Sequence, residues 1–357
     1  MNASYRVTEE HDRVWMHQAL RLARRGYGAT SPNQMVGALL VKDGQVIGRG
    51  WHRQAGGPHA EIEALRDAHK RGHSPRGATL FVTLEPCSTH GRTPPCTDAL
   101  IAAEIKRVVV GAIDPNPEHA GRGFRILQRA GIEAASLDSD IGRARHSVRA
   151  SARIAKPRRA RSDAPYQQLA EECARLNEAF NHWIVHRTPF VTVKAAMTLD
   201  GKIATASGES KWITAAAARA HGMKLRQGAD AVLVGINTIL ADDPSLTVRR
   251  QKAEGRRQKE RTPRRIILDS LARTPLSAKV VSDEFAGLTT LVVSRRAPKS
   301  RVAALARKVN VLIAPTEKLP IANRQSSISL RWLLRKLGGE DVTHPKGTPR
   351  SRARGLV

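Results

Sequence analysis

Four side chains in the first third of the sequence have the residue types and spacing of a zinc-dependent hydrolase. His59 and Glu61 are two residues apart, and Cys87 and Cys96 follow with eight residues between them. One imidazole and two thiolates suit tetrahedral Zn²⁺ with a fourth position left for water, whose pKa the metal lowers towards neutrality. Glu61 would then move protons from that water to a ring nitrogen and to departing ammonia. The quartet predicts a hydrolytic deaminase in which Glu61 is catalytic and His59, Cys87 and Cys96 are the metal ligands.

The two cysteines are further apart than in the general zinc-deaminase signature, His-x-Glu followed by Pro-Cys-x-x-Cys. An insertion therefore lies between the ligands, in the stretch 86–96. A structural zinc site is the alternative, and it would need a fourth protein ligand, for which His90 is available. Because that alternative leaves Glu61 without a role, we favour a catalytic zinc.

Alternating helix and strand patterns around these residues predict an α/β domain over 1–137 with a partly parallel sheet. The apolar spacing predicts a helix over 59–70, directly after Pro58. Asp43-Gly44 between two apolar runs predicts a β-hairpin. Further helices are expected over 8–26, 97–104 and 126–130, and strands over 36–41, 45–50, 79–84, 107–113 and 132–135.

The second half of the sequence predicts another α/β domain. Residues 138–165 are rich in Arg, Ala and Ser and are interpreted as a basic linker, followed by a domain over 166–344 and a disordered basic tail over 345–357. No Gly-x-Gly-x-x-Gly follows a strand, so a Rossmann domain is not indicated. The expected strands are 190–195, 231–235, 265–268, 289–293 and 309–313, and the expected helices are 215–227, 301–307 and 330–337.

Composition points to a cytoplasmic protein with small phosphorylated substrates. The 357 residues contain three cysteines, too few for a disulfide framework, and Cys173 is interpreted as a small buried hydrophobe. No apolar run approaches the roughly 20 residues that span a bilayer. The net charge of +28 is concentrated in 143–161, 249–265 and 346–354. Because these stretches lack apolar periodicity, we interpret them as solvated loops and do not expect a nucleic-acid partner.

The insertion between the cysteines, Cys-Ser-Thr-His-Gly-Arg-Thr-Pro-Pro-Cys, resembles one family closely. Supporting motifs lie in family order at 30–33, 36–37, 56–61, 83–87 and 114–117. The family is the bifunctional diaminohydroxyphosphoribosylaminopyrimidine deaminase / 5-amino-6-(5-phosphoribosylamino)uracil reductase of riboflavin biosynthesis. The resemblance implies a cytidine-deaminase-like three-layer domain that holds zinc and acts on 2,5-diamino-6-(5-phosphoribosylamino)pyrimidin-4(3H)-one. It also implies substrate contacts at Asn33, His52 and Arg92, and Thr89 occupies a position where many relatives would carry a second histidine.

The second half resembles the reductase domain of the same family, which has a dihydrofolate-reductase-like α/β fold and uses NADPH. The motifs that carry this resemblance begin with 194–204 and 207–214 and continue through 225–226, 230–231, 235–238 and 242–244. By position, the resemblance implies cofactor contacts at Ala196, Trp212, Thr238, Asp242 and Ser270. It implies contacts to the ribose phosphate of the reductase substrate at Ser210, Arg226, Leu246 and Arg249, and the two arginines suit a phosphate.

The resemblance stops near residue 344. The family continues into a Glu-Gly-Gly loop and final strands, whereas residues 345–354 here are basic and poor in apolar side chains. Gly338-Gly339 is interpreted as a helix end. We therefore expect a truncated or frameshifted reductase that lacks its last strands, with weak or absent reductase activity beside a working deaminase.

Several alternatives are left open at this point. One is a monofunctional deaminase with an inert reductase remnant. Others are a nucleic-acid base deaminase, which predicts the shorter cysteine spacing, and a non-catalytic zinc or RNA-binding protein, which needs no Glu61. We expect a homo-oligomer with no membrane association.

Overall fold

The computed structural model describes residues 3–90, 94–117, 119–137, 164–248, 262–318, 326–339 and 355–356. The chain divides into two compact units, Met1–Val185 and His186–Val357. The second domain was expected to begin at 166, but Leu169 and Cys173 pack into the core of the first unit beside Met16 and Leu20. Of the basic linker expected over 138–165, residues 138–163 lie outside the described residues and the last two belong to a helix. Among the helices that are described, none combines the length and the apolar character needed to cross a membrane.

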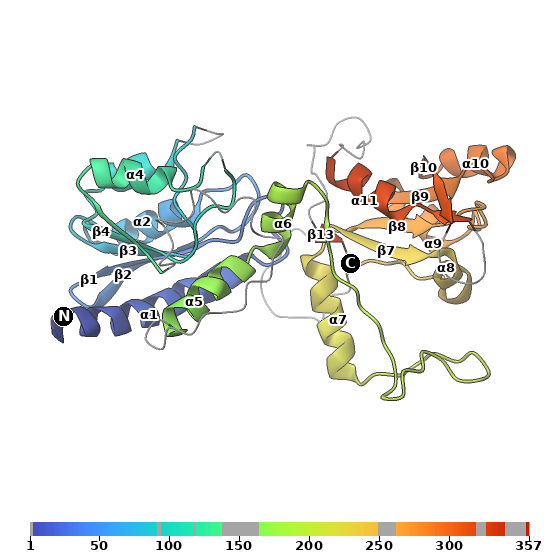
Figure 1. Ribbon diagram of the computed structural model, residues 1–357, viewed down its shortest axis with the longest axis horizontal. Helices are drawn as coiled ribbons and strands as arrows, with labels where there is room; N and C mark the ends of the chain where they lie inside the picture. Colours follow the sequence, from blue (N-terminus) through green and yellow to red (C-terminus); the bar gives the residue numbers. More distant parts are fainter. Residues whose placement is uncertain are drawn as a thin grey trace. The chain divides into compact units, whose positions relative to one another are not determined.

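The first unit is built on one mixed sheet with strand order β2-β1-β3-β4-β5 (Figure 1). β1 pairs antiparallel with both β2 and β3, while β3, β4 and β5 run parallel. The predicted hairpin is confirmed, and its turn residues Asp43 and Gly44 both have positive φ. The strands are β1 (Gly37–Lys42), β2 (Gln45–Trp51), β3 (Thr79–Val82), β4 (Arg107–Val110) and β5 (Glu133–Ser136).

Helices cover both faces of this sheet, which makes three layers. Alternate strand residues point to opposite sides, so that Leu80 and Val82 join one apolar cluster while Phe81 joins the other. The first cluster is covered by α2 (Ala60–Lys70), α3 (Cys96–Ala102) and α4 (Arg122–Arg129). The second is covered by α1 (Ala3–Ala23) and α5 (Ala164–Arg175), which lie side by side in Figure 1; the short η1 (Arg24–Gly26) follows α1, and α6 (Glu178–His186) follows α5.

The second unit has a parallel sheet with strand order β10-β9-β8-β7-β13-β6. Ile267 and Leu291 face one apolar cluster, and Ile266 and Val292 face the other. The strands are β6 (Phe190–Val191), β7 (Ala231–Gly235), β8 (Arg264–Leu268), β9 (Thr289–Ser294), β10 (Asn310–Ala314) and β13 (Gly355–Leu356). A small antiparallel pair is formed by β11 (Thr316–Lys318) and β12 (Ser326–Ile328).

Helices again lie on both faces of this sheet. The first cluster contains residues of α8 (Ile236–Asp242), α9 (Lys279–Ser282) and α10 (Lys299–Ala306). The second contains Leu333 and Leu337 of α11 (Leu330–Gly339). The remaining helical segments are α7 (Ala216–Gly228) and the short η3 (Ala286–Leu288).

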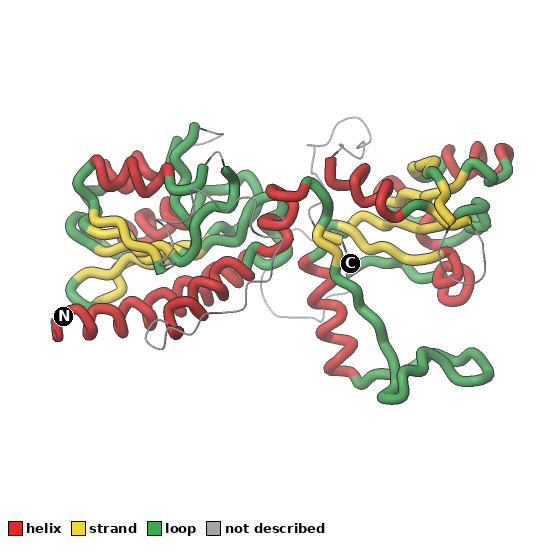
Figure 2. Tube along the Cα trace, in the orientation of Figure 1, coloured by secondary structure: helices red, strands yellow, loops and turns green. Residues whose placement is uncertain are grey.

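Two sequence expectations differ from the structure in this unit. The strand expected over 190–195 ends at Val191, and the chain from 192 to 215 is drawn as loop in Figure 2, with Val193 87% exposed. The tail expected to be disordered contributes β13, which pairs with Phe190 and Val191 of β6 and with Ala231 of β7. Pairing of so short a strand uses backbone groups, so the low apolar content of the tail did not predict it. Residues 340–354 and 357 lie outside the described residues.

Candidate active site

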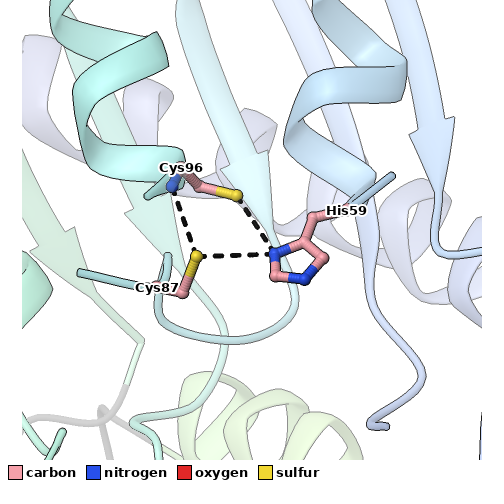
Figure 3. A group of neighbouring side chains, drawn as sticks. All are labelled: His59, Cys87 and Cys96. Atoms are coloured by element: carbon pink, nitrogen blue, oxygen red, sulfur yellow. Dashed lines mark hydrogen bonds between the residues drawn. The ribbon is translucent and has the colours of Figure 1, made fainter. Parts of the chain in front are cut away.

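His59, Cys87 and Cys96 converge on one point, as Figure 3 shows. The Nδ1 atom of His59 lies 3.3 Å from Sγ of Cys96 and 3.4 Å from Sγ of Cys87. Tetrahedral zinc with the usual Zn–S and Zn–N bond lengths separates its ligand atoms by about 3.5 Å. These three donor atoms are therefore close enough together to bind one zinc ion.

The three ligands are presented by the beginnings of two helices and the end of one strand. His59 is the N-cap of α2, with extended backbone after Pro58, and Cys96 is the first residue of α3. Cys87 follows β3, and the N-terminus of α3 holds it: the amide of Cys96 donates to its Sγ (3.2 Å) and the amide of Thr97 to its carbonyl (3.2 Å). Helix N-termini favour negative charge, so the thiolate form is stabilised here.

The electrostatics of the two thiols agree with a cation site. The hydrogen bond with Cys96, together with His59, lowers the pKa of Cys87 to about 4, while the same contact with Cys87 and burial raise the pKa of Cys96. A bound zinc ion would favour the thiolate form of both cysteines, because thiolates are its preferred sulfur ligands.

The described residues supply three ligands to this metal site. Within the described residues, the group of possible metal ligands whose donor atoms lie within 4.8 Å of one another consists of His59, Cys87 and Cys96. His90, the ligand that a closed structural site would need, is exposed and is not a member of this group. Three protein ligands with one open position are typical of catalytic zinc.

Glu61 lies on the first turn of α2 and is only 3% exposed. Burial raises its pKa to about 7, and the neighbouring Cys87 adds to the rise. A carboxyl group with a pKa near neutrality can both accept and release a proton under ordinary conditions. This supports the expected role of Glu61 as the proton carrier.

Asn33 and His52, both expected to contact the substrate, lie together beside the metal ligands. The side-chain amide of Asn33 is 3.1 Å from Nε2 of His52, and Nδ1 of His52 is 2.9 Å from the carbonyl of Pro58. The rings of His52 and His59 meet edge to face with centroids 5.6 Å apart. Burial lowers the pKa of His52, which favours a neutral ring that donates to Pro58 and accepts from Asn33. Thr89 is partly buried, and Arg92 lies outside the described residues.

Glu85 is a buried site residue that the sequence reasoning did not single out. Its carboxylate accepts hydrogen bonds from the amides of Asp114 (3.3 Å), Gly121 (2.9 Å) and Gly123 (2.8 Å). Glu85 comes two residues before Cys87. These hydrogen bonds therefore connect the loop that carries Cys87 to the backbone at Asp114, Gly121 and Gly123. A carboxylate directly before Pro86-Cys87 was the available signal, but its partners are 29 to 38 residues away in sequence.

The candidate cofactor residues of the second unit come from several segments. Thr238 and Asp242 are exposed residues of α8, and Trp212, on the 192–215 loop, is 73% exposed. Lys211 joins the loop to α8 through an ion pair with Asp242 at 3.0 Å. The carbonyl of Ser270 accepts hydrogen bonds from the amide and hydroxyl of Ser294. Among the described residues, no hydrogen bond or ion pair joins Ala196 to this group.

The candidate residues for the reductase substrate are only partly brought together. Arg226 of α7 donates to the carbonyl of Thr247 at 3.1 Å, next to the buried Leu246. The buried Arg265 donates to Ser245 in the same loop at 3.0 Å. Ser210 is exposed on the 192–215 loop, and Arg249 lies outside the described residues.

Comparison with protein families divides the chain as the structure does. Residues 9–112 match the model of the cytidine and deoxycytidylate deaminase zinc-binding region. Residues 189–344 match the model of the RibD C-terminal domain. The second match begins close to the boundary at His186.

Relatives that resemble the chain over both units have the same name. The riboflavin biosynthesis protein RibD of Aquifex aeolicus is 41% identical over 347 residues, which cover 97% of this chain and 83% of that protein. The protein of the same name from Escherichia coli is 42% identical over 272 residues, or 74% of this chain and 65% of that protein. The chain therefore spans somewhat less than two thirds of the second relative.

Two solved structures resemble this chain over most of its length. Acinetobacter baumannii RibD has a TM-score of 0.68 at 37% identity, and the matched region covers 92% of this chain and 77% of that chain. A diaminohydroxyphosphoribosylaminopyrimidine deaminase/5-amino-6-(5-phosphoribosylamino)uracil reductase from Thermotoga maritima has a TM-score of 0.69 at 32% identity, covering 97% of this chain and 80% of its own.

Proposed function

Because the chain belongs to the RibD family of riboflavin biosynthesis, we propose that it deaminates a phosphoribosylated diaminopyrimidine and then reduces the ribosyl group with NADPH. The observation that carries the first activity is the open metal triad of His59, Cys87 and Cys96 beside the buried Glu61. The match over 189–344 supports the second activity. A nucleic-acid base deaminase does not account for that second match.

The chemistry of the deaminase follows from the residues around the triad. When bound, zinc supplies a Lewis acid that makes a water molecule more acidic. Glu61 would take the two protons of the attacking water in turn, passing the first to the ring nitrogen and the second to the leaving amino group. The C–O bond forms first, the C–N bond then breaks, and ammonia departs. The buried position of Glu61 keeps bulk water from competing for these protons.

Substrate recognition is assigned to residues around the same site. Asn33, held against His52, offers amide groups suited to a pyrimidine edge. Arg92, in the insertion between the cysteines, offers a guanidinium for the ribose phosphate. These roles were expected from the family resemblance. They are supported by the contact of Asn33 with His52 and by the edge-to-face contact of His52 with the metal ligand His59.

The reductase is assigned to the second unit, with NADPH as the hydride donor. Trp212, Thr238 and Asp242 are exposed and therefore accessible to a large cofactor, and the partly buried Ala196 and Ser270 complete the expected set. Arg226 lies where its guanidinium can pair with a substrate phosphate next to Leu246, and Ser210 and Arg249 complete the expected set. A homo-oligomer in the cytoplasm is part of this proposal.

A pair of assays on the purified full chain tests both activities. We expect one zinc ion per chain, ammonia release from 2,5-diamino-6-(5-phosphoribosylamino)pyrimidin-4(3H)-one, and NADPH oxidation with the deaminated product. A zinc-loaded chain that releases no ammonia would overturn the deaminase proposal. Ammonia release without NADPH oxidation would overturn the second half of the proposal, the reductase activity, and leave the first half standing.

A further inference from the structure

Asn177 makes a two-point contact with the backbone of the loop that carries Asn33. Its side-chain oxygen accepts from the amide of Met35 at 2.7 Å, and its side-chain nitrogen donates to the carbonyl of Met35 at 2.9 Å. Asn177 is 6% exposed, and the two partners are 142 residues apart in sequence. Neither family match, over 9–112 or 189–344, includes Asn177.

The loop that Asn177 holds leads directly to the active site. Residues 29–36 contain no helix or strand, and the loop ends where Gly37 begins β1. Asn33 in this loop contacts His52, and the amide of His52 donates to the carbonyl of Val36 at 2.9 Å. Met35, which Asn177 holds, therefore lies between Asn33 and Val36, the two loop residues that contact His52.

Asn177 is itself held firmly by the first unit. It lies between α5 and α6, and α5 packs on the sheet through the buried Leu169 and Cys173. The approach is close: a Cβ added at Gly111 would lie 2.4 Å from Sγ of Cys173. The amide of Asn177 donates to the carbonyl of Ala174, which ties its backbone to the end of α5.

From this arrangement we propose that Asn177 is a positioning residue for the deaminase: it holds the 30–36 loop so that Asn33 meets the pyrimidine substrate. This inference rests on the proposed function of the site. A loop released from Asn177 would spend only a fraction of its time in the binding-competent position, and the apparent affinity falls by that fraction. Saturating substrate restores the competent position, so KM rises while kcat is preserved.

The test compares three variants of the full chain: Asn177→Ala, the isosteric Asn177→Asp and the control Asn181→Ala. Asn177→Asp keeps the side-chain volume but loses the donor to Met35. Asn181 lies four residues on, in α6, where its side chain donates to the carbonyl of Ala174 and does not reach the loop. Each is assayed for zinc content, for thermal unfolding, and for KM and kcat of ammonia release.

We expect Asn177→Ala to raise KM roughly tenfold, the size expected for a lost buried hydrogen-bonding pair. Its kcat should stay within about twofold of the unchanged chain, because saturating substrate selects the competent loop. Asn177→Asp should raise KM in the same direction, and Asn181→Ala should leave both parameters unchanged. Zinc content should be the same in all four proteins.

An unchanged KM in Asn177→Ala or Asn177→Asp would overturn the inference, whether or not kcat or zinc content falls. The same rise in KM in Asn181→Ala would also overturn it. Absence of ammonia release from the unchanged, zinc-loaded chain would instead be a failure of the proposed function. The two results are therefore distinguishable in one set of measurements.

Discussion

At the scale of single residues, two acidic side chains in the first turn of α2 have different surroundings. Glu61 is buried beside the metal ligands, and burial raises its pKa to about 7. Glu63 makes ion pairs with Arg53 at 3.0 Å and with Arg66 at 3.5 Å. Only the first of these carboxyl groups is placed to exchange protons with a substrate.

This difference makes Glu61→Gln a sharp test of the mechanism. The substituted amide would keep the volume of the side chain but could not accept a proton, so ammonia release should fall by about 10²- to 10⁴-fold. Zinc content, measured by metal analysis, should not change, because Glu61 is not among the ligands. The matched control Glu63→Gln should keep both zinc and activity. Full activity in Glu61→Gln would assign the proton transfer to another group.

At the scale of elements, the position of His59 and Glu61 depends on how closely α2 packs on β2. Gly50 of β2 lies directly beneath the helix: an added Cβ would be 2.1 Å from the carbonyl oxygen of Ala60 and 2.4 Å from the amide of Ala64. Such distances are shorter than any real contact, so the helix would have to shift. The absence of a side chain at Gly50 therefore allows α2, and with it the metal ligand His59, to lie this close to β2.

Gly50→Ala is expected to lower the free energy of unfolding by about 1–3 kcal/mol, because overpacking forces the backbone to move. It should also reduce zinc content, since His59 is the N-cap of the displaced helix. Denaturant unfolding and metal analysis measure these effects. Gly287→Ala is the control, because an added Cβ there meets no atom within 4 Å. Equal stability of the two variants would show that α2 tolerates the shift.

At the scale of the whole molecule, the first unit extends past the linker to include α5 and α6. Leu169 and Cys173 of α5 complete the apolar cluster under Phe81 and Val109. The segment 164–185 therefore belongs to the deaminase unit, although a linker separates it in sequence from the other elements of that unit. Asn177 adds a polar link from the same segment to the active-site loop.

Two shortened chains test this boundary. A chain ending at residue 185 should unfold cooperatively and bind one zinc ion, because it contains the whole first unit. A chain ending at residue 163 lacks Leu169 and Cys173, and we expect its free energy of unfolding to be lower by at least about 2–5 kcal/mol, the cost of deleting one large core side chain. Urea unfolding followed by circular dichroism measures both. Equal stability would place the boundary before 164.

The sequence alone determined the chemistry of the first unit and many elements of both units. The ligand types and their spacing indicated zinc, apolar patterns indicated α2 and β7, and Asp43-Gly44 indicated the hairpin, because these features depend on residues close together in the chain. Local patterns also predicted strands longer than those in the structure. The strand predicted over 190–195, for example, ends at Val191, where its backbone pairing stops.

Tertiary structure alone decided which distant groups complete the site. The three amides that hold Glu85, the clamp of Asn177 on Met35 and the packing of α5 on the first sheet join residues that are far apart in sequence. No local pattern marks such partners, because a buried polar side chain is satisfied by whichever backbone group the folded chain brings near it. The identity of the reaction could thus be inferred from neighbouring residues, whereas the positioning of its substrate loop required the fold.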